Sequence, residues 1–334
     1  MNRKISNIKI NNLVSQNKVI FLLYGLVIIL FIFGNTISKG FLNYNHVCAI
    51  LRTASFLGIV SMGQTIAILT GGIDLSVGPM ITMGNVFVCM FINGQNSNTL
   101  WAILFVIFLG VLFGSFSGLG VAYLKISPLV MTLAVGSLIT GITLIFSKGA
   151  PKGLASPILR YIGVGSLFDL LPVIIFIWLI LSVLCILLLN FSVFGRKIYY
   201  IGANEKAAFF SGIKTNFTKT MAYSISGATA VLGGSLMAGY TQTAFLGIGD
   251  EYILWSIAAV VIGGTALTGG KGGYVGTIAG TIIFVLLESI LTVMNMPEAV
   301  RKMANGAIIL ILISIYYNQE KAKVKIYQGE EKNV

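Results

Sequence analysis

The feature that most constrains this chain is the spacing of its charged residues, which divide it into apolar runs of membrane-spanning length. Only 10% of the 334 residues are charged, whereas 56% are hydrophobic. Because a bilayer core needs about 20 mostly apolar residues per helix, the runs predict about ten spans. So many spans leave no room for a soluble catalytic domain. The chain is therefore expected to be an all-α, polytopic membrane helix bundle.

The predicted spans begin and end near charged residues. The first spans lie between Lys18 and Lys39 and between Arg52 and Asp74. The run from Asp74 to Lys125 holds two helices, separated by a turn at 93–98. Further spans lie between Lys125 and Lys148, between Asp169 and Arg196, and after each of Lys219, Glu251, Lys271 and Lys302. We expect one domain over residues 1–334, with a tail at 1–18, a helix bundle at 19–317 and a second tail at 318–334.

The distribution of Lys and Arg predicts that both termini are cytoplasmic. In that orientation fifteen of these residues lie inside and six outside, and Arg52 lies near the outer end of the second span. Such an excess on the inside is typical of membrane proteins. The net charge of +12 suits the anionic inner leaflet, so no nucleic-acid partner is expected. Residues 1–38 could also be a signal peptide, but their apolar run is too long.

Residues typical of catalysis or metal binding are scarce. The cysteines, Cys48, Cys89 and Cys185, all fall inside predicted spans, so no disulfide is expected. A single histidine, His46, excludes His-rich metal sites and His-based triads.

The segment nearest to a phosphate-binding loop is Gly269-Gly270-Lys271. A P-loop needs a Gly at the first position and a Ser or Thr after the Lys. Thr265 and Gly272 occupy those positions. The chain is therefore not expected to be an enzyme or to bind a cofactor.

Small residues recur every fourth position in three predicted spans. They are Gly110, Gly114 and Gly118; Ser226, Ala230, Gly234 and Ala238; and Gly272, Gly276 and Gly280. Such stripes allow helix backbones to approach closely in lipid. They predict a tightly packed bundle and say little about function.

One short sequence occurs twice. Leu69-Thr70-Gly71-Gly72, followed by Val77-Gly78, recurs as Leu267-Thr268-Gly269-Gly270, followed by Val275-Gly276. Both copies are expected at the inner end of a helix that runs from outside to inside. The recurrence fits a parallel internal repeat, or it is a coincidence between two glycine-rich turns.

The longest predicted cytoplasmic loop covers residues 192–218. Asn204 suits a helix N-cap, Glu205 the first helical turn and Gly212 the C′ position. These residues predict a helix of about two turns with a loop on either side. Because so short a helix is marginal in water, it needs a packing partner, and Phe209 and Phe210 make it a candidate docking element.

Four segments resemble the membrane permeases of bacterial ABC importers of the ribose, xylose and galactose type, which include autoinducer-type sugar permeases. They are Gln64–Leu69 with Gly71–Gly78, Lys125–Pro128 with Met131–Leu133, Gly195–Ile213, and Ile257–Thr265 with Gly269–Gly272. The resemblance extends over about 19–317. It implies a multi-pass protein of the bacterial cytoplasmic membrane that forms a dimer with a second permease subunit.

The resemblance also implies partners for this chain. These are cytoplasmic ATPase subunits, which carry ATP and Mg²⁺, and an extracytoplasmic sugar-binding protein. The ATPase-coupling residues would be Gly195, Arg196, Asn204, Glu205, Ala207, Ala208, Phe209 and Gly212. Lys206 stands where the family's loop pattern has a Glu, which leaves the polar part of that contact open.

Polar residues inside spans are costly and tend to face a cavity or another helix. The candidates for a translocation path or its hairpin are Arg52, Gln64, Asp74, Asn85, Thr132 and Glu288. Asp74 is expected in a loop, where it accepts backbone N–H groups, and Glu288 is expected to pair with Arg301 or Lys302. Two alternatives stay open: a permease for nucleosides or branched-chain amino acids, and a secondary transporter that uses Glu288.

Overall fold

The computed structural model describes the chain as a bundle of helices over residues 2–167, 170–307 and 310. The long helices are α1 (Asn2–Ile37), α2 (Tyr44–Leu69), α3 (Val77–Ile92), α4 (Thr99–Ala122), α5 (Pro128–Ser147), α7 (Val173–Phe191), α10 (Thr215–Thr241), α11 (Asp250–Ile262) and α12 (Tyr274–Val293). The shorter ones are η1 (Asn96–Asn98), α6 (Pro157–Val164), α8 (Val193–Ala203) and α9 (Glu205–Phe210). Residues 298–307 are also helical.

Sheet structure is confined to a small hairpin and one bridge in the described part of the chain. Strands β1 (Ser166–Leu167) and β2 (Leu171–Pro172) pair antiparallel, with Ser166 opposite Pro172. An isolated antiparallel bridge joins Leu154 to Thr243. The expectation of an all-α bundle is confirmed.

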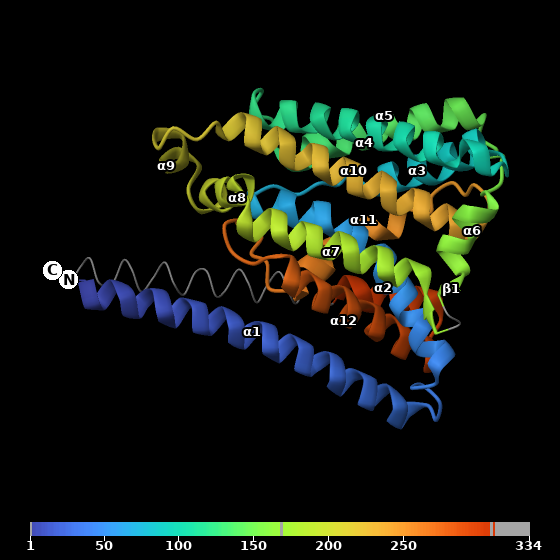
Figure 1. The fold of residues 1–334 in the computed structure, drawn as a ribbon, viewed down its shortest axis with the longest axis horizontal. Coiled ribbons are helices and arrows are strands. Elements are labelled where there is room, and N and C mark those ends of the chain that lie inside the picture. Colours follow the sequence, from blue (N-terminus) through green and yellow to red (C-terminus); the bar gives the residue numbers. More distant parts are fainter. Residues whose placement is uncertain (1, 168–169, 308–309, 311–334) are drawn as a thin grey trace.

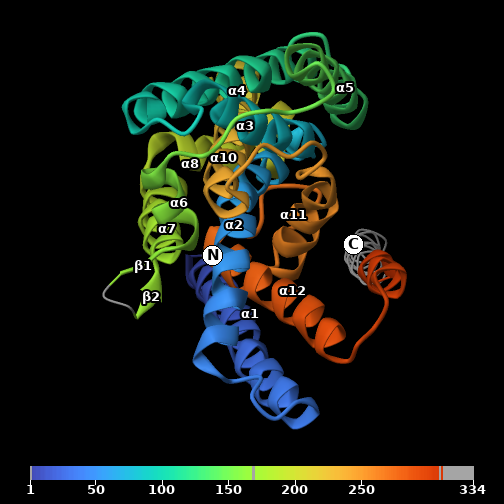
Figure 2. The same cartoon turned by 90° about the vertical axis from the view of Figure 1, so that its right-hand side faces the viewer.

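The helices pack around α10, which contacts α2, α3 and α4. Helices α4 and α5 cover one side of this centre, and α11 and α12 lie on the other (Figure 2). Helix α1 stands apart along one flank and packs against α12. Helices α8 and α9 lie at one end of the bundle and α6 at the opposite end (Figure 1).

Seven helices in the described residues are long and apolar enough to cross a membrane, namely α1, α2, α4, α5, α7, α10 and α12. Helix α3 is apolar but has 16 residues, and α11 has 13. Both coincide with predicted spans and are shorter than a full crossing. The tenth predicted span, after Lys302, lies largely outside the described residues, as does the tail at 318–334. The chain is a multi-pass membrane protein.

The glycine stripe of α4 lies directly against the backbone of α10. A methyl group on Gly114 would overlap the carbonyl oxygen of Tyr223, and one on Gly118 would lie 2.6 Å from Cα of Thr220. Close backbone approach of this kind is how helices associate in lipid. The predicted role of this stripe in packing is confirmed.

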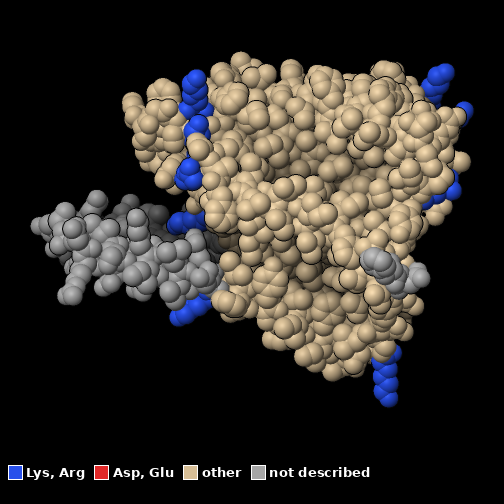
Figure 3. Space-filling view, viewed as in Figure 1, with Lys and Arg blue, Asp and Glu red and all other residues tan. Residues whose placement is uncertain are grey.

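Charged side chains lie at the ends of the bundle, and the cysteine thiols lie in its core. Lys and Arg gather at the two ends, and the broad band between them on the visible face carries no charge (Figure 3). Cys48, Cys89 and Cys185 are free thiols, and all three are buried in the protein core.

Candidate functional site

The segment predicted as a loop with one short helix contains two helices. Helix α8 occupies residues that were expected to be irregular, and its N-cap Ser192 accepts a hydrogen bond from the backbone N–H of Gly195 at 2.9 Å. A methyl group on Gly195 would overlap the carbonyl oxygen of Leu189, so glycine permits the sharp corner between α7 and α8. Arg196 is exposed at this corner and donates to the carbonyl of Phe191. The prediction missed α8 because its apolar face is short.

The second helix, α9, has the predicted caps. The side chain of Asn204 accepts a hydrogen bond from the N–H of Ala207 at 3.0 Å. At the other end Gly212 adopts a φ of +81°, and its N–H and that of Ile213 donate to the carbonyls of Phe209 and Ala208. This is a Schellman motif. Both predicted ends of the helix are confirmed.

Glu205 fixes α9 to two other parts of the bundle. Its carboxylate accepts from Nζ of Lys219 in α10 at 2.5 Å and lies 3.5 Å from Nζ of Lys125, in the α4–α5 connection. Partial burial favours a higher pKa for Glu205, but the hydrogen bond and charge of Lys219, with those of Lys125, lower the pKa overall. Sequence reasoning placed Glu205 at a helix end and missed both lysines.

The two faces of α9 differ. Ala208 is 4% exposed, whereas Phe209 and Phe210 are 63% and 85% exposed, with their rings in a T-shaped contact 5.8 Å apart. A concavity of about 430 Å³ between α8 and α9 is lined by Tyr200, Ala203, Asn204, Ala207, Ala208, Ser211 and Ile213. Exposed aromatic rings beside an apolar hollow are typical of a protein-binding surface.

The two copies of Leu-Thr-Gly-Gly are brought together at the end of the bundle that carries α8 and α9. One copy ends α2 and the other lies between α11 and α12, and the N–H of Gly270 donates to the carbonyl of Leu69 at 3.0 Å. Gly71 and Gly269 both have positive φ, +82° and +89°. Their contact explains a shared need for glycine and leaves the origin of the repeat open.

Asp74 lies in the α2–α3 connection and is completely buried, as expected. Its Oδ1 accepts from the N–H of Ser76 at 2.9 Å and from the Ser76 hydroxyl at 2.5 Å. The hydroxyl of Thr132 accepts from the N–H of Leu75 at 3.0 Å. Asp74 and Thr132 therefore hold the α2–α3 hairpin in place.

A set of buried polar atoms without a hydrogen-bond partner lies along the core helices. It comprises Ser61 Oγ, both amide atoms of Gln64, Asp74 Oδ2, Ser117 Oγ, Tyr223 Oη and Ser226 Oγ. Buried polar groups normally find partners, so the atoms from α2 and α10 mark a polar interior between these two helices, whereas Ser117 lies in α4. Sequence reasoning found only Gln64 and Asp74. The i, i+3 spacing of Ser61 with Gln64 and of Tyr223 with Ser226 is the signal that could have indicated the others.

Arg52 and Asn85 belong to contacts at the opposite end. Arg52 donates to the carbonyl of Val164, the last residue of α6, at 3.3 Å. Asn85 accepts from the N–H of Phe245 at 2.8 Å and donates to the Thr241 hydroxyl. The six predicted path residues thus lie at different levels of the bundle and do not form one cluster.

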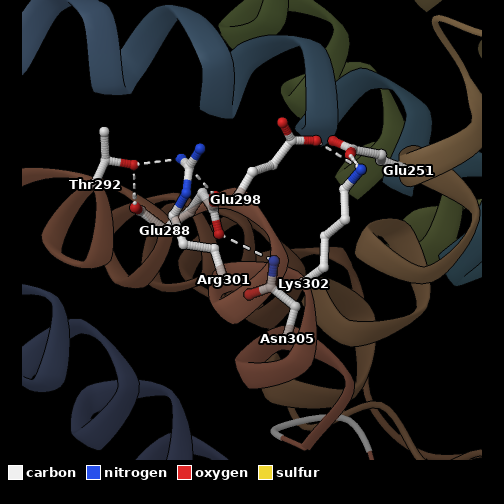
Figure 4. A network of polar contacts seen from close by, with 7 residues as sticks. All are labelled: Glu251, Glu288, Thr292, Glu298, Arg301, Lys302 and Asn305. Atoms are coloured by element: carbon white, nitrogen blue, oxygen red, sulfur yellow. Dashed lines mark hydrogen bonds and ion pairs between the residues drawn. The ribbon is translucent and has the colours of Figure 1, made fainter. Parts of the chain in front are cut away.

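Glu288 belongs to a polar network near the end of α12 (Figure 4). Its carboxylate accepts from Arg301 at 3.1 Å and from the side-chain amide of Asn305 at 2.9 Å. Arg301 also donates to the Thr292 hydroxyl at 2.7 Å. Lys302 pairs instead with Glu251 and Glu298. Of the two predicted partners of Glu288, Arg301 is confirmed.

These arrangements provide buried hydrogen-bonding groups and an exposed surface. Within the described ranges no three His, Cys, Asp or Glu side chains come together as a metal site. The buried hydroxyl and amide groups can accept or donate hydrogen bonds to a polar solute. The exposed α9 surface offers a place for a protein partner.

Known proteins similar to this chain agree on one family. Residues 47–313 match the family described as "Branched-chain amino acid transport system / permease component". The chain is 34% identical to the ribose import permease protein of Bacillus subtilis over 85% of this chain and 88% of that protein. It is 32% identical to the same-named protein of Haemophilus influenzae over 94% and 96%.

A further relative is the autoinducer 2 import system permease protein of Salmonella paratyphi B, with 30% identity over 85% of this chain and 82% of that protein. No solved structure matches the chain. Because the family match covers most of the sequence and the relatives are matched nearly end to end, the chain belongs to this family of transport-system permease components.

Proposed function

We propose that the chain is the membrane permease subunit of an ATP-binding-cassette importer for a small sugar. The observation that carries the proposal is the near full-length similarity to ribose and autoinducer 2 import permeases. In this proposal a separate cytoplasmic ATPase supplies the energy and an extracytoplasmic binding protein delivers the sugar. The polar interior around Gln64 and Tyr223 supplies hydrogen-bonding groups that suit a sugar's hydroxyls.

The proposed topology has about ten spans with both termini in the cytoplasm. The end of the bundle that carries α8 and α9 would face the cytoplasm, and the start of α1 lies at that same end (Figure 1). The end with α6 and the Glu288 network would face the binding protein. The protein would act in the bacterial inner membrane, as a dimer with a second permease subunit.

In this proposal α9 is the coupling helix. Its exposed rings, Phe209 and Phe210, would enter a groove on the ATPase, and the Glu205 ion pairs would hold the helix in place. The absence of a complete P-loop in the sequence supports a separate source of energy.

The experiment is gentle purification of the tagged chain from its host, with mass spectrometry of the proteins that co-purify. We expect an ATPase subunit. The variant Phe210→Ser should lose it, whereas the matched variant Phe245→Ser, which alters an exposed ring at the outer end, should retain it. Preparations without an ATPase, repeated after crosslinking, would contradict the proposal.

A second candidate substrate is a branched-chain amino acid, favoured by the description of the matching family. Uptake of labelled ribose in cells that express the transporter, with unlabelled ribose or leucine as competitor, separates the two. A secondary transporter centred on Glu288 is disfavoured, because its carboxylate is already bonded to Arg301 and Asn305. Such a carrier needs a group free to bind the coupling ion.

A further inference from the structure

Three backbone segments meet without intervening side chains at the inner end of the bundle. They are the end of α8 at Gly202, the end of α2 at Leu69–Gly72 and the α11–α12 connection at Leu267–Gly270. A methyl group on Gly202 would overlap both the carbonyl oxygen of Leu69 and the nitrogen of Gly270. We call this contact the glycine junction. It joins the cytoplasmic helices to two core regions at once.

The contact is tight from each side. A methyl group on Gly269 would lie 3.0 Å from Cα of Gly202 and 3.0 Å from Cα of Gly71. One on Gly270 would lie 2.6 Å from the nitrogen of Ala203. No residue larger than glycine fits at these positions while the backbones keep their places.

Hydrogen bonds hold the same segments together. The N–H of Gly270 donates to Leu69, and the hydroxyl of Tyr199 in α8 donates to the carbonyl of Gly272 at 3.0 Å. Burial raises the pKa of Tyr199 to about 12, so its hydroxyl keeps the proton that it donates. Helix α8 is therefore bonded to the connection that leads into α12.

The junction differs from the other attachment of these cytoplasmic helices. The Glu205 ion pairs use long, partly exposed side chains, which can reorient as α9 moves. Backbones in direct contact cannot reorient in this way, because a close-packed protein interior has low compressibility. A shift of α8 must therefore displace the end of α2 and the segment before α12, or break the contact.

We propose that the glycine junction is the link through which movement of the coupling helices reaches α2 and α12, with Gly202 as a positioning residue. The inference rests on the proposed importer function. From Leu69 the chain continues directly into the hairpin that holds Asp74, and a methyl group on Gly72 would overlap the Tyr223 hydroxyl. Movement at Gly202 thereby reaches the polar interior between α2 and α10.

The test uses the complex of this chain with its ATPase in proteoliposomes, with binding protein loaded with ribose. The variant is Gly202→Ala, and the matched control is Gly141→Ala in α5, where an added methyl group meets nothing within 4 Å. The readouts are the amount of assembled complex, the ATPase stimulation by loaded binding protein, and the ATP hydrolysed per ribose transported.

We expect Gly202→Ala to assemble and hydrolyse ATP, with the ATP consumed per ribose raised about fivefold and the control unchanged. A ratio equal to that of the wild type would overturn the proposal. Tyr199→Phe, which removes one hydrogen bond and adds no volume, should raise the ratio about twofold. If Gly202→Ala fails to assemble, Tyr199→Phe decides: a raised ratio supports the junction, and an unchanged ratio overturns it.

The controls separate this inference from the proposed function. A wild-type preparation that has no ATPase, or whose ATPase ignores loaded binding protein, contradicts the importer itself. A wild-type complex that transports ribose beside a normally coupled Gly202→Ala contradicts only the junction.

Discussion

Glu205 and Glu288 lie at opposite ends of the bundle and are stabilised in different ways. Glu205 bonds to Lys219 in α10 and to Lys125 in the α4–α5 connection. Glu288 bonds to Arg301 and Asn305, which both belong to the helix at 298–307 that follows α12. The first carboxylate joins distant parts of the chain, whereas the second closes a local corner between α12 and the helix at 298–307.

This difference predicts how each end responds to substitution. A carboxylate whose partners lie on different elements holds those elements together, and its loss loosens their attachment. A carboxylate with neighbouring partners stabilises one corner and leaves the rest of the bundle unchanged. We therefore expect substitutions of Glu205 to affect coupling, and those in the Glu288 network to affect mainly local stability.

The largest effect is expected from charge reversal at Glu205. In Glu205→Lys three ammonium groups would face one another, and like charges in contact cost several kcal/mol. Ribose uptake should fall about tenfold or more at equal membrane levels. The double variant Glu205→Lys with Lys219→Glu should regain part of that uptake. Reversal at exposed Lys206, the neighbouring residue, serves as control. Normal uptake in Glu205→Lys would remove the distinction between the two ends.

A smaller effect is expected in the network around Glu288. Arg301→Met leaves the carboxylate of Glu288 without its cation, which should cost about 1–3 kcal/mol. Glu288→Gln keeps an acceptor for Arg301 and should cost less. Thermal unfolding in detergent would show the order, with uptake by Glu288→Gln changed only modestly. A larger loss for Glu288→Gln would mean that the glutamate has a role beyond its corner.

The pH dependence of the Glu205 attachment should be slight near neutrality. The pKa of Glu205 is lowered from 4.5 in the folded protein, so its stabilisation is complete above that value and is lost as pH falls through the folded pKa. The difference in unfolding temperature between the wild type and Glu205→Gln should stay constant between about pH 6 and 8. It should shrink below pH 4.5. A change centred near neutrality would point to another group.

The smallest effect is expected from Lys302→Ala. Its ammonium pairs with Glu251 and Glu298, but the side chain is 57% exposed. Exposed ion pairs contribute little to stability. The unfolding temperature should therefore change by about 1 °C or less, well below the change for Arg301→Met. An equal loss for both variants would show that the outer network acts as one unit.

Features that depend on neighbouring residues could be predicted from the sequence. Hydropathy placed helices at α1 to α5, α7 and α10 to α12, because a lipid-facing helix must be apolar wherever it packs. The caps at Asn204 and Gly212 involve residues close in sequence. The pairing of Glu288 with Arg301 could be predicted because both were expected near the same end of one predicted span.

Features that depend on distant segments could not be predicted. Lys125 lies 80 positions from Glu205, and nothing local indicates that pairing. Lys219 is only 14 positions away, but its contact depends on how α9 folds against α10. The repeated Leu-Thr-Gly-Gly was visible in the sequence, but its contact with Gly202 appears only once α8 is folded against both copies. The lengths of α3 and α11 were also missed, since hydropathy does not show where a buried helix stops.

The burial of Cys48, Cys89 and Cys185 has a practical consequence for this protein. A water-soluble maleimide should react slowly with these thiols while the chain is folded. A single cysteine introduced at a loop would then be the main reactive position, and native residues would not need replacement. Comparing maleimide labelling in intact cells with labelling in opened membranes would assign each loop to one side of the membrane. The assignments would determine the number of membrane crossings and the location of both termini.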